Sequence, residues 1–326
     1  MINLVYNEMV KLTGKRKLLV VSLILGVLIS VFTYAQYRQA EENRKRVGEV
    51  NWRIALEQRI FSWENRMKNS RTTEEARKEL AIRVAQQRYY LDHDINPSEP
   101  GAPTFVRGFV ENSINLLLPL MMMVLAADLV SSEHSAGTMK VLLTRSVKRW
   151  RILLSKYLAL LLSVSMIILT FGLLSAVISG AVFGFSGWTA PVLIGFAVDD
   201  GLLDVSGVQQ VSQWQFIGME LGLAWFVSTV VATITFMLSV LLRSTAAVMG
   251  IMLSCLIAGT ILSSMIASWE SAKYLFMVNL KLIDYLHNAA PPIEGMSLGF
   301  SLMVLLVWGA LALAVSFVSF TRRDVY

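Results

Sequence analysis

The sequence lacks any arrangement of side chains that would catalyse a reaction. Its three histidines, His93, His134 and His287, are isolated, and none has a partner at the spacing of zinc ligands. It has no Gly-x-Ser-x-Gly elbow, and Thr13-Gly14-Lys15 lacks the upstream glycine of a phosphate-binding loop. No pair of acids inside an apolar run could relay protons. We therefore expect no catalytic, cofactor-binding or metal-binding residue in this chain.

Cysteine and charge are also scarce. The single cysteine, Cys255, lies inside an apolar run and has no partner for an internal disulfide, so it reads as a small apolar filler. Only 16% of the residues are charged, whereas 55% are hydrophobic, and the mean hydropathy is +0.57. These values indicate an integral membrane protein. The net charge of +6 is concentrated in short loops beside apolar runs, which favours contact with anionic lipid over nucleic acid.

Six apolar stretches are long enough to cross a membrane, which takes roughly 20 residues. Their interiors contain no Lys or Arg, each of which would cost at least about 2.5–3.5 kcal/mol at the midplane. Asp128, Glu220 and Arg243 lie near span ends, where we expect their side chains to reach the polar interface. The sequence predicts an all-α integral membrane protein with six transmembrane helices, at residues 18–37, 113–130, 157–184, 217–242, 246–267 and 297–320.

The short loops predict the orientation of these helices. Lys and Arg gather before the first span, between the second and third, and after the sixth, whereas residues 185–216 contain acids but no Lys or Arg. By the positive-inside rule, both termini face the cytoplasm. Residues 38–112 hold many Arg residues but are placed outside, because long loops obey this rule poorly.

Three regions follow from this plan. Residues 1–37 hold a short amphipathic helix at 2–12, placed in the membrane interface, and the first span; the alternative for 2–12 is a frayed tail. Residues 38–112 form an extracellular helical hairpin, acting either as a gating or partner-binding element or as a spacer. Residues 113–326 hold five spans, a cytoplasmic elbow at 131–156 and an extracellular loop at 268–296. The aromatic content of that loop is typical of a membrane interface, and the loop forms either short re-entrant or interfacial helices or a plain amphipathic loop.

A row of small residues runs along the fifth span at successive i+4 positions, Ala246, Gly250, Ser254 and Ala258. Small residues let another helix approach closely in a membrane. The row therefore marks either an interface between subunits or ordinary packing within one bundle.

The elbow at 131–156 is a basic, amphipathic segment between two apolar runs. Leu142 and Leu143 give it an apolar edge, and a basic run from Arg145 to Lys156 leads into the third span. This pattern suits either a docking surface for a soluble partner or a surface helix held by anionic membrane lipid.

The elbow resembles the segment between the second and third spans of ABC-2 type exporter permeases. That family's pattern is Glu-x-x-x-Gly-Thr, then leucines, then Arg-Pro-Val-x-Arg and a Lys opening the next helix. The present chain matches it except that Ser146 replaces the proline. The resemblance implies a coupling helix that docks into a groove of a separate ABC ATP-binding subunit, through Glu133, Gly137, Thr138, Leu142, Leu143 and Arg145.

This resemblance also implies a function. The chain would be the permease subunit of an ATP-driven exporter in a bacterial plasma membrane, paired with a second permease copy or a paralogue. It would not be an enzyme, because ATP and Mg would bind to the partner ATPase subunit. The small-residue row of the fifth span would be a dimer-interface candidate. The alternative is a membrane-embedded sensor or scaffold whose hairpin binds a ligand and whose elbow recruits a signalling protein. The substrate cannot be read from the fold.

Overall fold

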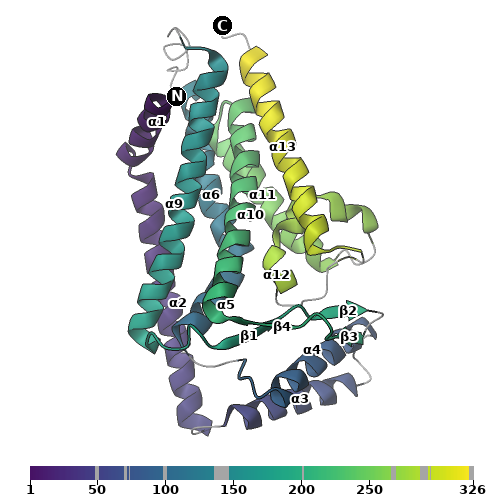
Figure 1. Cartoon of the computed structure of the whole chain (residues 1–326). Coiled ribbons are helices and arrows are strands. Elements are labelled where there is room, and N and C mark those ends of the chain that lie inside the picture. Colours follow the sequence, from purple (N-terminus) through teal and green to yellow (C-terminus); the bar gives the residue numbers. More distant parts are fainter. Residues whose placement is uncertain are drawn as a thin grey trace.

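The computed structural model describes residues 1–47, 51–69, 72, 74–97, 101–135, 147–199, 202–265, 269–286, 293 and 295–322. Long helices form an elongated bundle, and a layer of helices and short strands lies across one end of it (Figure 1). The bundle elements are α1 (Ile2–Gly14), α2 (Lys17–Val47), α5 (Ala102–Ile114), α6 (Leu117–Ala126), α7 (Asp128–Ser135), α9 (Arg149–Phe183), α10 (Gln213–Leu241), α11 (Thr245–Met265) and α13 (Leu298–Arg322).

The predicted class, an all-α integral membrane protein, is confirmed. Among the described residues, five helices are long and apolar enough to cross a membrane. A bent pair, Ala102–Ile114 with Leu117–Glu133, passes the same test as a unit, so that the candidate crossings number six if this pair is one broken span and five if it is a re-entrant loop. The five single spans are Lys17–Glu42, Arg149–Phe183, Gln213–Leu241, Thr245–Leu262 and Leu298–Arg322.

The bent pair turns by 56° between α5 and α6. Pro119 stands in the first turn of α6 and cannot donate a backbone hydrogen bond to the carbonyl four residues before it, that of Asn115. Because a proline both removes that bond and crowds the preceding turn, it accounts for a sharp kink at this point.

Helix α5 belongs to the bundle, which corrects the predicted boundary between residues 112 and 113. It packs against α9 and α10 and buries most of one face. Phe105 stacks on Phe109 at 5.8 Å between ring centroids, and Phe109 stacks on Phe171 of α9 at 5.4 Å. Polar residues such as Arg107 and Glu111 interrupt this stretch of sequence, so its apolar face does not stand out as a long hydrophobic run.

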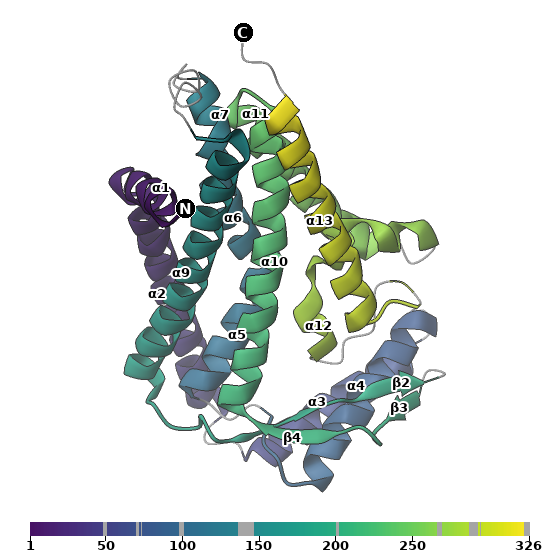
Figure 2. The same ribbon diagram turned by 45° about the horizontal axis from the view of Figure 1, so that its top comes forward.

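The bundle is organised around α10. This helix packs against α5, α6, α9 and α13, and it is the span with the largest buried share. Figure 2 shows α10 running between α9 on one side and α13 on the other. Helix α2 packs mainly on α9 and leaves much of its apolar surface exposed, as a helix facing lipid does.

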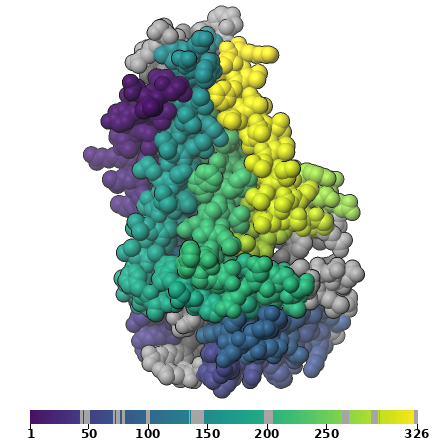
Figure 3. Space-filling view, in the orientation of Figure 1, coloured from purple at the N-terminus to yellow at the C-terminus, as the bar shows by residue number. Residues whose placement is uncertain are grey.

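The predicted outer hairpin is present as α3 (Trp52–Met67) and α4 (Glu74–Asp92), which pack on each other. The first helix of the hairpin is separate from the helix of the first span. Helix α2 ends at Val47, and α3 begins after Asn51, whose side chain accepts a hydrogen bond from the Arg53 backbone N–H. The hairpin therefore lies across the end of the bundle as a separate layer, coloured blue in Figure 3.

Four short strands join the hairpin to the bundle, although the sequence predicted only a loop there. β1 (Pro191–Ile194) pairs antiparallel with β4 (Gln209–Ser212), and β2 (Ala197–Asp199) pairs antiparallel with β3 (Leu202–Asp204). Leu193 and Phe196 pack with Ile95 just beyond α4. The strands thus fasten the hairpin to the beginning of α10.

The described part of the 268–296 loop forms three short helical elements, η1 (Glu270–Tyr274), η2 (Phe276–Leu280) and α12 (Leu282–Leu286), and their place at a membrane interface stays a prediction. Helix η2 packs between α11 and α13. Gly259 of α11 faces it so closely that an added Cβ would lie 2.7 Å from the Cβ of Met277. This close approach is the reason why glycine is needed at that position.

Two ends of the bundle are distinguished below. The termini end holds α1, the last turn of α13, the C-terminus of α7 and the N-terminus of α9 (Figure 1). The hairpin end holds α3, α4 and the four strands.

Candidate functional site

A network of ion pairs at the termini end joins three segments that are far apart in the sequence. Its centre is Lys156, two turns into α9, whose side chain is 1% exposed. The Lys156 Nζ donates to Glu8 Oε2 of α1 at 2.9 Å, to Glu133 Oε1 of α7 at 2.7 Å and to the Leu129 carbonyl at 3.3 Å. An ammonium group has three protons, so these three acceptors satisfy it.

Lys11 completes the network from the surface. Its Nζ lies 2.7 Å from Glu8 Oε1 and 3.3 Å from Glu133 Oε1. The four groups carry two positive and two negative charges, so the network is balanced. We call Glu8, Lys11, Glu133 and Lys156 the charge lock.

The charge lock holds Glu8 and Lys11 in their charged forms. Burial alone would raise the pKa of Glu8, but Lys156 and Lys11 outweigh it and lower that pKa below its ordinary value. Burial would likewise lower the pKa of Lys11, but hydrogen bonding and attraction to Glu8, together with Glu133, raise it. Each charge is therefore stabilised by its partners across the interface between helices.

A second group of charges lies beside the charge lock. Asp128, at the start of α7, pairs with Lys17, and the Lys15 Nζ lies 3.5 Å from its Oδ2. These ion pairs tie α7 to the junction between α1 and α2. The expectation that Asp128 reaches the polar interface stays a prediction.

Hydroxyl groups fix the other side of α7. The Ser239 Oγ of α10 accepts hydrogen bonds from the backbone N–H groups of Val130 and Ser131, at 3.1 and 3.0 Å. The Ser131 Oγ in turn lies 2.8 Å from Thr245 Oγ1 at the start of α11. Helix α7, which contains the first residues of the elbow, is thus held by α1, α9, α10 and α11 together.

Of the six predicted docking residues, the structure describes only Glu133. Its side chain is 15% exposed, and its carboxylate is turned toward Lys156 and Lys11. The other five residues lie outside the described part of the chain: Gly137, Thr138, Leu142, Leu143 and Arg145. Their docking role stays a prediction.

The small-residue row of α11 lies on the outside of the described chain. Ala246, Gly250 and Ser254 are exposed, and Ala258 is half-buried. A Cβ added to Gly250 would meet no described heavy atom within 4 Å outside its own helix and chain neighbours. A second copy or lipid can therefore approach the row, and the dimer interface stays a prediction.

Glu8 was missed by the sequence reasoning. A recognisable signal does exist, because Glu8, Lys11 and Lys15 share one face of the first helix with Leu12. Glu220 was misplaced, since its side chain does not reach a polar interface but is fully buried within α10, in the electrostatic range of Arg107 and Glu111. Among the described residues, no group of three or more His, Cys, Asp or Glu could hold a metal ion.

Fold and site together define a multi-pass helical membrane protein whose termini end is held by buried ion pairs. The chain belongs to the family described as "Protein of unknown function (DUF2705)", whose model matches residues 80–326. It is 28% identical over 330 residues to "Uncharacterized protein YhcI" of Bacillus subtilis, covering all of this chain and 99% of that protein. It is 24% identical over 215 residues to "Uncharacterized membrane protein YdbK" of the same species, covering 65% of this chain and 80% of that one.

Proposed function

We propose that this chain is the membrane-spanning permease subunit of an ATP-driven ABC exporter, with ATP hydrolysed by a separate subunit. The observation that supports this most is the charge lock. It includes Glu133, near the start of the elbow, and it connects this residue directly to α1 and to the long span α9. A force applied to residues 136–146 would reach both helices through two buried ion pairs rather than through a flexible loop.

The proposed orientation follows from charge. In the short connections that the structure describes, Lys and Arg gather at the termini end, in the last turn of α1, the start of α2 and the first turns of α9. The hairpin also holds many Arg residues, but it is long, and long loops obey the charge rule poorly. The positive-inside rule places the termini end in the cytoplasm and the hairpin end outside. The bacterial relatives suit a location in the plasma membrane.

Coupling in this proposal is mechanical. The partner subunit would bind ATP and Mg, and its closure would press on the elbow. The permease then needs two arrangements of its helices with different affinities for the closed and open partner, because a ligand shifts an equilibrium only by its differential affinity. The charge lock would keep α1, α7 and α9 moving as one body between those arrangements.

In this proposal a second permease copy would complete the path that the substrate takes across the membrane. The exposed small-residue row of α11 supplies a surface on which another helix can approach closely. Replacing Gly250 and Ser254 with Leu is expected to weaken the dimer, measured by crosslinking in membranes. An intact dimer in that variant would assign the row to lipid.

The decisive test is whether an ATPase subunit co-purifies with this chain. Purification from the native host in mild detergent should bring along a subunit with a Walker motif, and its ATPase rate should change when the permease is present. Gly137→Trp is expected to release or uncouple that subunit without loss of membrane insertion. Gly299→Trp is the matched control, because Gly299 is an exposed glycine at the far end of α13.

Either of two results would contradict the proposal: a complex without any nucleotide-hydrolysing subunit, or an ATPase rate indifferent to the permease. A membrane-embedded sensor or scaffold is the second candidate, favoured by a cavity at the hairpin end. That candidate predicts a cytoplasmic partner without a Walker motif.

A further inference from the structure

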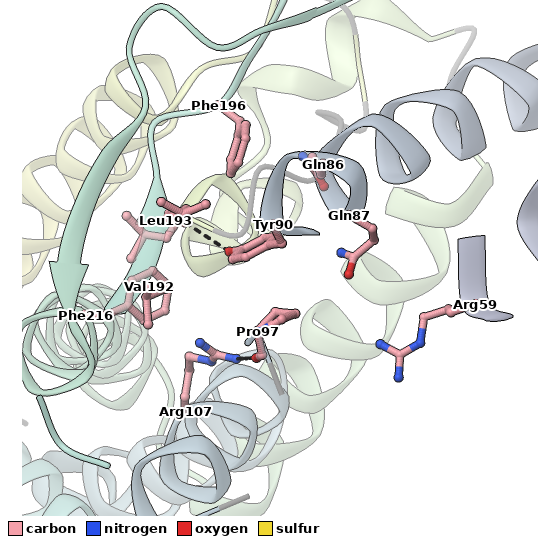
Figure 4. A pocket seen from close by; sticks show the side chains of 11 residues that line it. Arg59, Gln86, Gln87, Tyr90, Pro97, Arg107, Val192, Leu193, Phe196 and Phe216 are labelled. Atoms are coloured by element: carbon pink, nitrogen blue, oxygen red, sulfur yellow. Dashed lines mark hydrogen bonds between the residues drawn. The ribbon is translucent and has the colours of Figure 1, made fainter. Parts of the chain in front are cut away.

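The hairpin end contains a cavity of about 230 Å³ that is unrelated to the charge lock. It lies where the hairpin meets the strands and the ends of α5, α10 and α12, so distant parts of the sequence line it together (Figure 4). Its lining consists of Arg59, Gln86, Gln87, Tyr90, Pro97, Arg107, Val192, Leu193, Phe196, Phe216 and Leu286.

The formal charge of this lining is positive. Arg59 from α3 and Arg107 from α5 approach the cavity from opposite sides in Figure 4, and none of the described lining residues is acidic. An anionic group in the cavity would thus meet two guanidinium groups, which match the planar geometry of a carboxylate.

Arg107 is held in position before any ligand arrives. Its Nη2 donates to the Pro97 carbonyl at 3.3 Å, and its guanidinium lies 5.7 Å from the centroid of the Phe216 ring. Glu111 and Glu220 interact with it electrostatically, but each lies one turn further into the bundle than Arg107 or Phe216. These two side chains do not line the cavity.

Two glutamine side chains supply further hydrogen-bonding groups. Gln86 Nε2 and Gln87 Oε1 are buried and have no hydrogen-bond partner within the described chain. Buried polar atoms are normally paired, so a polar group bound in the cavity would satisfy them. Gln87 extends between Arg59 and Arg107 in Figure 4.

The remaining wall is apolar. Val192, Leu193, Phe196, Phe216 and Leu286 face the same space as the polar groups. The cavity is smaller than the roughly 300–1,000 Å³ of pockets that take drug-sized ligands. Its occupant must therefore be small, with one charged group beside one apolar group.

We propose that this cavity binds a carboxylate attached to a small apolar side chain, either in a free acylated amino acid or in the last residue of a peptide. The guanidinium groups of Arg59 and Arg107 bind the carboxylate, the glutamine amides bind the adjoining amide, and the apolar wall holds the side chain. This proposal stands on the cavity alone and does not depend on ATP-driven transport.

The test is a titration of the full-length protein in nanodiscs by calorimetry. N-acetyl-leucine is expected to bind, and its uncharged counterpart N-acetyl-leucinamide to bind at least about tenfold more weakly, because a charged hydrogen bond is lost. Equal binding of the two probes, or binding of neither, would overturn the proposal. Inorganic phosphate binding as tightly as N-acetyl-leucine would overturn it as well.

A second arm identifies the source of the carboxylate. The peptide acetyl-Ala-Ala-Leu with a free carboxyl group is compared with its carboxamide and with N-acetyl-leucine. Tighter binding of the free peptide than of N-acetyl-leucine assigns the cavity to peptide ends, whereas weaker binding assigns it to free acids.

Variants locate the site. Arg59→Gln is expected to weaken binding of N-acetyl-leucine at least about tenfold, and because Arg59 is exposed the variant should fold normally. Arg107→Gln should have at least the same effect. Arg66→Gln is the matched control, because Arg66 lies on the same helix outside the cavity, and binding should stay within about twofold. Equal losses in Arg59→Gln and Arg66→Gln would contradict the proposed site.

Discussion

The two ends of this molecule place charged residues in opposite ways. At the termini end, two acids and two lysines alternate in the charge lock, and each ammonium contacts carboxylate oxygen. At the hairpin end, two arginines flank a cavity that no described acidic residue lines. Opposite charges in contact hold helices together, whereas like charges around a space leave it open for an anion. The charges of the termini end therefore hold helices together, whereas those of the hairpin end carry the anion site that we propose.

The largest effect is expected from removing the centre of the charge lock. Lys156→Met leaves Glu8 and Glu133 with only the half-exposed Lys11 as a shared cation, which should lower the free energy of unfolding by about 3–5 kcal/mol. Unfolding followed by tryptophan fluorescence in detergent measures this loss. The control is Lys148→Met at an exposed lysine beside the same helix, where we expect at most about 0.5 kcal/mol.

A triple variant separates charge from packing. Glu8→Gln, Glu133→Gln and Lys156→Met together remove the unpaired charges, so much of the lost stability should return. A triple variant as unstable as Lys156→Met alone would show that the packed lysine stem, and not its charge, matters at this site.

The hairpin end should depend on backbone fit instead. Gly195 follows β1 with φ of +86°, and an added Cβ would lie 2.4 Å from the Gly207 carbonyl oxygen. Gly195→Ala should therefore lower the free energy of unfolding by about 1–3 kcal/mol, measured in the same way. Gly295 shares the positive φ, at +82°, but an added Cβ meets no described atom within 4 Å. Equal losses in Gly195→Ala and Gly295→Ala would exclude the contact with Gly207 as the cause.

Low pH should remove the stabilisation that Glu8 contributes to the charge lock. Because the pKa of Glu8 is lower in the folded protein than in the unfolded chain, its stabilising effect is present above the ordinary value of 4.5 and is lost as the pH falls through the folded value. Unfolding midpoints from pH 7 to pH 3 should thus decline more steeply in the wild type than in Glu8→Gln. Parallel curves would show that Glu8 contributes nothing to the acid sensitivity.

The smallest effect is expected at the surface of the hairpin. Arg88 Nη2 lies 2.5 Å from Glu64 Oε1, but the arginine side chain is 62% exposed. Arg88→Gln should cost at most about 1 kcal/mol, and raising the salt concentration should reduce the difference from wild type. A loss as large as that of Lys156→Met would break the distinction between the two ends.

Much of the fold could be predicted from hydrophobic run length. The five single spans and the second half of the bent pair all appear as long apolar stretches, because a spanning helix must satisfy its backbone within itself and face lipid with apolar side chains. Helix α5 could not be found this way, because it interrupts its apolar face with Arg107 and Glu111 and packs against protein. The strands after α9 were missed for a similar reason, since β1 to β4 are three or four residues long and owe their pairing to the hairpin beside them.

The features of the candidate site were likewise predictable only in part from the sequence. The basic elbow and the exposed small-residue row were visible as patterns within single segments. The charge lock was not visible, because Glu8 and Lys156 are separated by 148 residues and meet only where α1 crosses α9. The cavity gathers its lining from six such segments, none of which has a binding motif.

The sequence by itself determined that this chain crosses a membrane repeatedly, begins with an amphipathic helix and carries a basic elbow, because hydropathy and periodicity act within a continuous stretch of chain. Only the tertiary structure decided which charges pair and which remain around a cavity. The physical reason is distance: ion pairs and cavities depend on side chains brought within a few ångströms by packing, and separation along the chain does not specify which of them will meet.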